Sequence, residues 1–128
     1  MTDFSKAPTS FFVPTTDGDI SKTFYAEVLG LELVEDTQFA VVFKLADSEL
    51  RLSKVSDFKP FPWTVLDFQV DDISVAMKGL RDQGVKLQHY NEMGQDEDGV
   101  WVAPGGTTQI AWFKDPDGNV LSVSQRGK

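Results

Sequence analysis

Three stretches of the sequence alternate apolar residues with residues whose side chains can bind ligands or transfer protons. Arg51 lies between Leu50 and Leu52, and residues 65–70 and 120–124 show the same alternation. Successive side chains of a strand point to opposite faces, so the polar groups are expected to share one face of a sheet. These groups are carboxylates, one guanidinium, one amide and several hydroxyls, at Glu49, Arg51, Ser53, Asp67, Gln69, Ser122 and Ser124.

The polar faces are compatible with chemistry and also with a purely structural role. Carboxylates such as Glu49 and Asp67 can act as general acids or bases. Polar faces of antiparallel strands are also commonly just solvated, and Arg51 can equally form a structural ion pair with Glu49 or Asp67. The single histidine, His89, ends a predicted strand, and a lone histidine there is more often structural or exposed than catalytic. Residues 95–99 are expected to form an exposed hairpin tip.

The elements that position these residues occur twice in the same order, with a period of about 60 residues. Each copy has a strand, a helix and then two or three strands, and Pro60 and Pro62 interrupt regular structure between the copies. This repeat predicts an α+β fold, in which one domain over residues 1–128 contains modules at about 10–57 and 64–125, joined by a linker at about 58–63. The predicted strands are residues 10–13, 32–35, 39–45, 49–55, 65–70, 85–89, 100–103, 109–113 and 120–124, and the predicted helices are residues 21–30 and 74–83.

Both predicted helices have an apolar stripe at helical spacing and a polar residue that can cap the first turn. In the first helix the stripe is Ile20, Phe24, Val28 and Leu31, with Asp19 or Ser21 as the cap. In the second it is Ile73, Ala76, Met77 and Leu80, with Asp71 or Asp72 as the cap.

The composition is that of an ordinary globular domain with a strong acidic balance. The 128 residues carry a net charge of −8, which disfavours binding to nucleic acid and to anionic membranes. The sequence has no cysteine, which excludes disulfides, thiolate metal sites and a cysteine nucleophile. No apolar run approaches the length of a membrane span, and the first residues lack the pattern of a signal peptide, so a cytoplasmic location is expected.

Several short motifs in order resemble those of the vicinal oxygen chelate superfamily, which includes glyoxalase I, extradiol dioxygenases, and the bleomycin and fosfomycin resistance proteins. They are Phe24-Tyr25 with Leu29-Gly30, Val70-Asp71-Asp72-Ile73, Gly84-Val85, and Phe113-Lys114-Asp115-Pro116-Asp117-Gly118-Asn119. The resemblance covers residues 10–125. It implies paired βαβββ modules whose mixed sheets form a U-shaped cleft for a divalent metal and a substrate, and it implies a homodimer.

The resemblance also implies four metal-ligand positions, which metal-using members fill with His, Gln or Glu. Carried onto this sequence, they fall on Ser10, Arg51, Val65 and Ser122. None of these is a usual ligand of a divalent metal, and the charge of Arg51 would repel a cation. A register error of two residues would bring Glu49 to the second position. We therefore expect no metal and no other cofactor.

The leading hypothesis is metal-free binding of a small organic molecule in the cleft, since a groove with apolar walls and a few polar groups suits such a ligand. Arg51 would fix an anionic or polar group, and Trp63, Trp101 and Trp112 are candidates for the rim or floor. The alternatives are a metal-dependent lyase or dioxygenase, a metal-free acid–base enzyme that uses Glu49 or Asp67, and a module whose acidic face binds a protein partner. The cleft candidates are Ser10, Phe12, Glu49, Arg51, Trp63, Val65, Asp67, Gln69, Trp101 and Ser122.

Overall fold

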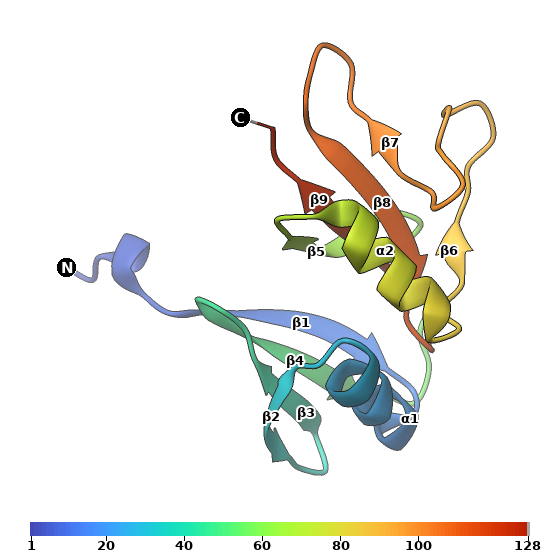
Figure 1. The fold of residues 1–128 in the computed structure, drawn as a ribbon. Coiled ribbons are helices and arrows are strands. Elements are labelled where there is room, and N and C mark those ends of the chain that lie inside the picture. The colour runs from blue at the N-terminus through green and yellow to red at the C-terminus, as the bar shows by residue number, and fades with distance from the viewer. Residues whose placement is uncertain (128) are drawn as a thin grey trace. The chain divides into compact units, whose positions relative to one another are not determined.

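The computed structural model describes residues 1–127, and the chain divides into two compact units. The first unit is Met1–Lys59 and the second begins at Pro60, so the division falls within the predicted linker. Each unit contains one sheet and is described by itself (Figure 1). Among the described residues, no helix is both long enough and apolar enough to span a membrane.

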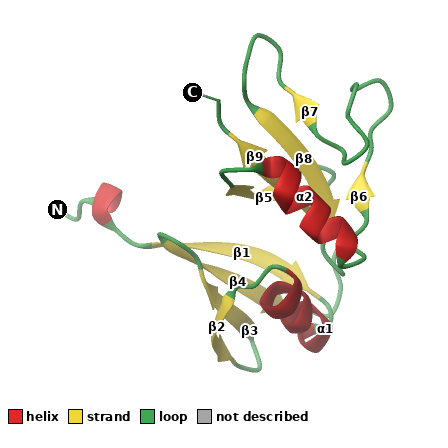
Figure 2. Ribbon diagram, in the orientation of Figure 1, coloured by secondary structure: helices red, strands yellow, loops and turns green. Residues whose placement is uncertain are grey.

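The first unit is a four-stranded mixed sheet with one interrupted helix (Figure 2). Its strand order is β1-β4-β3-β2, in which β1 and β4 are parallel and the other neighbours antiparallel. A 3-10 helix (Phe4–Lys6) precedes the sheet, and a π-helical turn (Phe24–Val28) continues α1. The elements are β1 (Thr9–Thr15), α1 (Gly18–Thr23), β2 (Glu32–Asp36), β3 (Ala40–Lys44) and β4 (Ser48–Lys54).

The second unit repeats this topology in the order β5-β9-β8-β6. Its first and last strands along the chain, β5 and β9, are again parallel neighbours. One short strand is added, which pairs with the free end of β8. The two-module α+β prediction is therefore confirmed, although β6 and β7 are only two residues long, shorter than predicted. The elements are β5 (Thr64–Gln69), α2 (Ile73–Asp82), β6 (Leu87–Gln88), β7 (Trp101–Val102), β8 (Gln109–Lys114) and β9 (Val120–Gln125).

An aspartate begins the helix at the same place in both units. The Asp17 carboxylate accepts a hydrogen bond from the Ile20 amide, and the Asp72 carboxylate accepts one from the Val75 amide, both at 3.1 Å. These bonds satisfy amides that have no partner within the first helical turn. The prediction of Asp72 is confirmed, whereas the prediction of Asp19 or Ser21 as the first cap is wrong.

The buried face of the first helix also differs from the predicted stripe. Ser21 and Tyr25 are fully buried, while Ile20 is 56% exposed. The Ser21 and Thr15 hydroxyls are 2.7 Å apart, and the Tyr25 ring lies 6.1 Å from that of Phe43 on β3. A hydroxyl pair therefore brings the helix onto the sheet, and the apolar pattern alone does not reveal this contact. In α2 the predicted residues Ile73, Met77 and Leu80 are buried as expected.

The apolar faces of both sheets form the cores of their units. In the first unit Leu50 and Leu52 are fully buried, and in the second Phe113 and Leu121 are. Figures 1 and 2 show α2 along one face of β8 and β9, and these elements are in contact. Because side chains alternate along each strand, the polar residues between the core residues lie on the opposite face of each sheet.

Candidate functional site

On the polar face of the first unit, four side chains are linked by direct contacts. The Ser10 hydroxyl donates to Glu49 Oε2 at 3.0 Å, and Arg51 Nη1 lies 3.5 Å from the same oxygen. The Arg51 guanidinium also lies 5.7 Å from the centre of the Phe12 ring, which fits a cation–π contact. Of the two ion pairs considered for Arg51, the one with Glu49 is present, and the charge of Arg51 is balanced within its own sheet.

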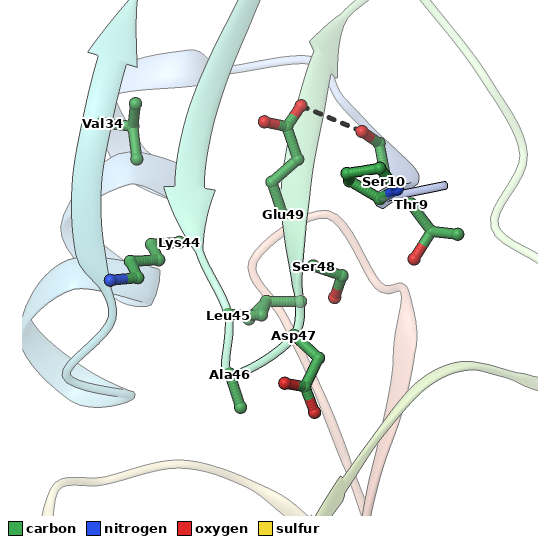
Figure 3. A pocket seen from close by; sticks show the side chains of 10 residues that line it. Thr9, Ser10, Val34, Lys44, Leu45, Ala46, Asp47, Ser48 and Glu49 are labelled. Atoms are coloured by element: carbon green, nitrogen blue, oxygen red, sulfur yellow. Dashed lines mark hydrogen bonds between the residues drawn. The ribbon is translucent and has the colours of Figure 1, made fainter. Parts of the chain in front are cut away.

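A hollow of about 420 Å³ lies at one end of this group, where β4 begins (Figure 3). Figure 3 shows the Glu49 carboxylate turned toward Ser10, while Asp47 lies at the turn below it. The hollow combines hydroxyls with charges of both signs, because Lys44 also contributes to it. Such a lining can hold a small polar molecule, but it has no aromatic surface. It is lined by Pro8, Thr9, Ser10, Val34, Lys44, Leu45, Ala46, Asp47, Ser48 and Glu49.

In the second unit, one carboxylate is held by two serine hydroxyls. The Ser122 hydroxyl donates to Asp67 Oδ1 at 2.7 Å, and the Ser124 hydroxyl donates to Asp67 Oδ2 at 2.8 Å. Both serines are buried on β9, the parallel neighbour of β5, whereas Asp67 is exposed. Each carboxylate oxygen therefore has a fixed position and keeps a lone pair for a further donor.

An aromatic cluster occupies the same face as Asp67. Trp112 is the register partner of Ser122, which is in turn the register partner of Asp67, so the three share one face. The Trp112 indole nitrogen donates to the Thr64 hydroxyl on β5 at 3.1 Å. Because β9 lies between β8 and β5, the Trp112 side chain extends across β9. The indole therefore reaches β5, the strand that carries Asp67.

Two further rings complete the cluster. The Tyr90 ring meets Trp112 edge-on, with ring centres 5.7 Å apart, and the Trp101 ring lies 6.2 Å from Trp112. Partial burial raises the pKa of the Tyr90 hydroxyl above its usual value, so this tyrosine is neutral at physiological pH. We name the set Asp67, Ser122, Ser124, Trp112, Trp101 and Tyr90 the Asp67 face.

The loop that carries Tyr90 is held by the side chains of Gln95 and Asp98, which lie in the segment predicted to be an exposed hairpin tip. The Gln95 amide accepts from the Tyr90 backbone amide at 2.6 Å and donates to the carbonyls of Gln88 and Gly99 at 2.9 and 2.8 Å. Asp98 is buried and forms an ion pair with Arg81 of α2. The exposed-tip prediction is therefore wrong for Asp98 and Gly99, because these side-chain bonds hold this part of the loop against the unit.

Some predicted site residues lie apart from the Asp67 face. The register between β5 and β9 shifts at Val65, which has no partner in β9, and Thr64 takes a place on the face instead. Trp63 is 58% exposed and stacks on Phe61, with ring centres 4.6 Å apart. Gln69 is the register partner of Ser124 and so shares this face of the sheet, but it lies exposed at the end of β5 and lines a separate hollow with Asp71 and Thr107, among others. The predicted cleft, which combines residues of both modules, stays a prediction.

Sequence reasoning missed two residues of this arrangement, Thr64 and Tyr90. Thr64 was hidden by the shift in register, which reverses the parity of strand β5 at its first residues. Tyr90 lies outside every strand, so alternation carries no information about it. The one indication in the sequence was that Tyr90 directly follows His89, the single histidine of the chain.

The residues at the implied metal-ligand positions do not fit a divalent cation. The Ser122 hydroxyl donates its proton to Asp67, Arg51 is a cation, and Val65 has no ligand atom. Within residues 1–127, no three His, Asp or Glu side chains are grouped so that they could hold a metal ion. Divalent metals require several oxygen or nitrogen ligands together.

Comparison with known proteins gives a match over most of the chain. The family model described as the Glyoxalase/Bleomycin resistance protein/Dioxygenase superfamily matches residues 8–123. A search of curated protein sequences finds no match.

Several solved structures are similar in fold. A lactoylglutathione lyase from Agrobacterium tumefaciens is 21% identical, with 94% of this chain and 93% of that chain covered and a TM-score of 0.72. A glyoxalase family protein from Enterococcus faecalis is also 21% identical, with 95% and 99% covered and a TM-score of 0.75. TnmS3, an antibiotic binding protein from Streptomyces sp. CB03234, is 27% identical, with 95% and 97% covered and a TM-score of 0.73.

Proposed function

Because the chain belongs to the Glyoxalase/Bleomycin resistance protein/Dioxygenase superfamily, we propose that it binds a small organic molecule without a metal, and that the Asp67 face is its binding surface. The observation that carries the proposal is the position of Asp67. Its two oxygens are oriented by buried hydroxyls, and the aromatic cluster lies beside them. Organic ligands are commonly held by this combination of apolar surface and a few fixed polar groups.

The aromatic cluster supplies the apolar part of the binding surface. Trp112 is held by its hydrogen bond to Thr64 and by its contacts with Tyr90 and Trp101. Aromatic side chains offer a large contact area, and a ring that is already fixed loses little conformational freedom when a ligand binds. A flat apolar body stacked on these rings could donate a hydrogen bond to Asp67.

Similarity to one binding protein supports this proposal over catalysis. TnmS3 is an antibiotic binding protein, and it is more similar in sequence to this chain than the lyase is. We therefore expect ligand capture rather than turnover. We also retain the expectation of a cytoplasmic homodimer as part of the proposal. Size-exclusion chromatography with light scattering tests the dimer, and cell fractionation tests the location.

A second candidate is metal-free acid–base chemistry at Asp67. The carboxylate is exposed and oriented, as a general base must be when it approaches a substrate. Under this alternative a bound molecule would be converted, whereas under the leading proposal it would be released unchanged.

Native mass spectrometry of the gently purified chain, paired with elemental analysis, tests the proposal. We expect a retained organic mass and no stoichiometric divalent metal. Trp112→Ala should lose the retained mass, while Trp63→Ala, at an exposed tryptophan outside the Asp67 face, should keep it. One divalent ion per chain would contradict metal-free binding. Retention that is equal in both variants would contradict the Asp67 face as the binding surface.

A further inference from the structure

We propose that Asp67 binds a positively charged nitrogen, so that the ligand is an organic cation with a flat apolar body. This inference rests on the proposed function and adds the chemical class of the ligand. It follows from the charge balance on the face, the orientation of the carboxylate and the position of the Trp112 indole.

The first step concerns the charge of Asp67. Among residues 1–127, no salt bridge includes Asp67. Its two partners, Ser122 and Ser124, are neutral hydroxyl donors. They orient the carboxylate but leave its negative charge uncompensated. A ligand cation is the group that would complete this arrangement.

The second step separates Asp67 from an ordinary surface carboxylate. An exposed aspartate usually has free rotation and is solvated by water, so an ion pair with it gains little. At Asp67 both oxygens are held by hydroxyls that are only 3% and 2% exposed on the neighbouring strand. Their free lone pairs therefore have fixed directions before a ligand arrives, which lowers the entropic cost of pairing.

The third step is the aromatic surface beside the carboxylate. The Trp112 side chain extends across β9 to its hydrogen bond with Thr64, so its ring lies close to the strand that carries Asp67. An indole face attracts cations through its quadrupole, more strongly than a phenyl ring does. A ligand whose cation meets Asp67 can therefore place both its charge and its apolar body over favourable groups.

The field of the whole chain acts in the same direction. A net charge of −8 attracts cations and repels anions at long range. This effect is weakened by salt and does not choose a site, so it supports the class of ligand while the local geometry places it.

The test uses three probes with the same ring and different charge: 1-naphthylmethylamine as the cation, 1-naphthalenemethanol as the neutral alcohol and 1-naphthoate as the anion. The chain has three tryptophans, so three indole N–H signals report binding by nuclear magnetic resonance. We expect the amine to shift the Trp112 and Trp101 signals and to bind about tenfold more tightly than the alcohol, with the anion weakest. The Trp63 signal should move least.

Two charge variants sharpen the result. Asp67→Asn should reduce the affinity for the amine to that for the alcohol, while leaving the alcohol within about twofold of its original affinity. Asp82→Asn removes the same charge from an exposed position at the end of α2 and should keep the preference for the amine. Where Asp67→Asn fails to fold, the ratio of the three probes on the unmodified chain decides the proposal when it is measured in salt that screens the net charge of the chain.

The outcomes separate this inference from the proposed function. Equal binding of amine and alcohol, with Trp112 shifted, would overturn the cation inference and leave small-molecule binding at the face intact. If none of the three probes shifts Trp101 or Trp112 up to about 5 mM, both the inference and the proposed binding surface are wrong.

Discussion

The two units use the same topology and place a serine–carboxylate hydrogen bond at the same pair of strands, yet they differ in how the carboxylate charge is balanced. In the first unit Ser10 on the first strand donates to Glu49 on the last strand. In the second the roles are exchanged, and Ser122 on the last strand donates to Asp67 on the first. Arg51 then compensates Glu49, whereas Asp67 has hydroxyl partners alone.

This difference indicates how a duplicated fold can divide its tasks. On the first sheet Arg51 contacts both the Glu49 carboxylate and the Phe12 ring, so the two opposite charges are paired with each other. In the second sheet Ser122 lies opposite the carboxylate, and the next residue across the sheet is the aromatic Trp112 rather than a cation. The charge of Glu49 is therefore paired on the first face, while the second face has a carboxylate without a cationic partner on the same side of the sheet as the aromatic cluster. We propose ligand binding in the second unit because its carboxylate has no cationic partner.

The largest expected effect is on the stability of the second unit. Trp112→Ala removes the ring that crosses β9 and should lower the free energy of unfolding by about 2–3 kcal/mol. Phe12→Ala at the corresponding face of the first unit should cost less than about 1 kcal/mol, because Phe12 is 68% exposed. Urea unfolding followed by far-ultraviolet circular dichroism measures both variants.

Tryptophan fluorescence adds a control, because all three tryptophans of the chain lie in the second unit. The Phe12→Ala variant should leave the fluorescence spectrum of the folded chain unchanged. If Phe12→Ala costs as much as Trp112→Ala, the two faces are equally structural and the contrast between the units is lost.

A smaller effect is expected from the hydroxyls that orient Asp67. Replacing Ser122 and Ser124 together by alanine should lower the free energy of unfolding by about 1–2 kcal/mol, since two hydrogen bonds to a charged group are lost. Ser10→Ala in the first unit should cost less than about 0.5 kcal/mol, because its bond to Glu49 is exposed. Thermal and urea unfolding measure this difference. Equal losses in the two units would contradict the stronger fixation of Asp67.

The sequence predicted much of the fold because alternation and turn residues act locally. Leu50 and Leu52 identify the core side of β4, and Gly118 supplies the positive φ of 88° in the turn between β8 and β9. The first helix was predicted one residue out of register. Its buried face depends on the contact between Ser21 and Thr15, which joins a helix to a strand and leaves no periodic signal in the sequence.

The site could be predicted where it depends on the alternation of side chains within one strand. It could not be predicted where it depends on which strands are adjacent in the sheet. Parity correctly grouped Asp67 with Gln69 on one strand and Ser122 with Ser124 on another. The bond from Ser122 to Asp67 joins residues 55 positions apart, and it requires β5 and β9 to be adjacent and parallel. Predicting Thr64 on this face would have required knowledge of the register shift at Val65, and no residue type in the sequence indicates that shift.

The smallest expected effect is an acid-dependent loss of stability that begins in the first unit. Lys54 Nζ lies 2.7 Å from Asp36 Oδ1, and Lys22 Nζ lies 3.0 Å from Asp36 Oδ2. The hydrogen bonds from Lys54 and then Lys22 lower the pKa of Asp36 below its usual 3.8. The folded chain therefore holds this carboxylate ionised more strongly than the unfolded chain, so its contribution is present above the unfolded pKa and is lost as the pH falls below it.

Asp36→Asn should consequently lower the midpoint of thermal unfolding slightly at neutral pH. This difference should shrink as the pH falls through the lowered pKa of Asp36, because protonation then removes the charge that pairs with the two lysines. Asp57→Asn removes the same charge from an exposed position and should show no such pH dependence. Circular dichroism between about pH 2 and pH 7 measures the midpoints, and tryptophan fluorescence reports on the second unit alone. A difference between Asp36→Asn and the original chain that does not shrink as the pH falls would show that Asp36 acts through packing rather than through its charge. The pair of Glu49 with Arg51 would then be the one remaining charge contrast between the polar face of the first unit and the Asp67 face.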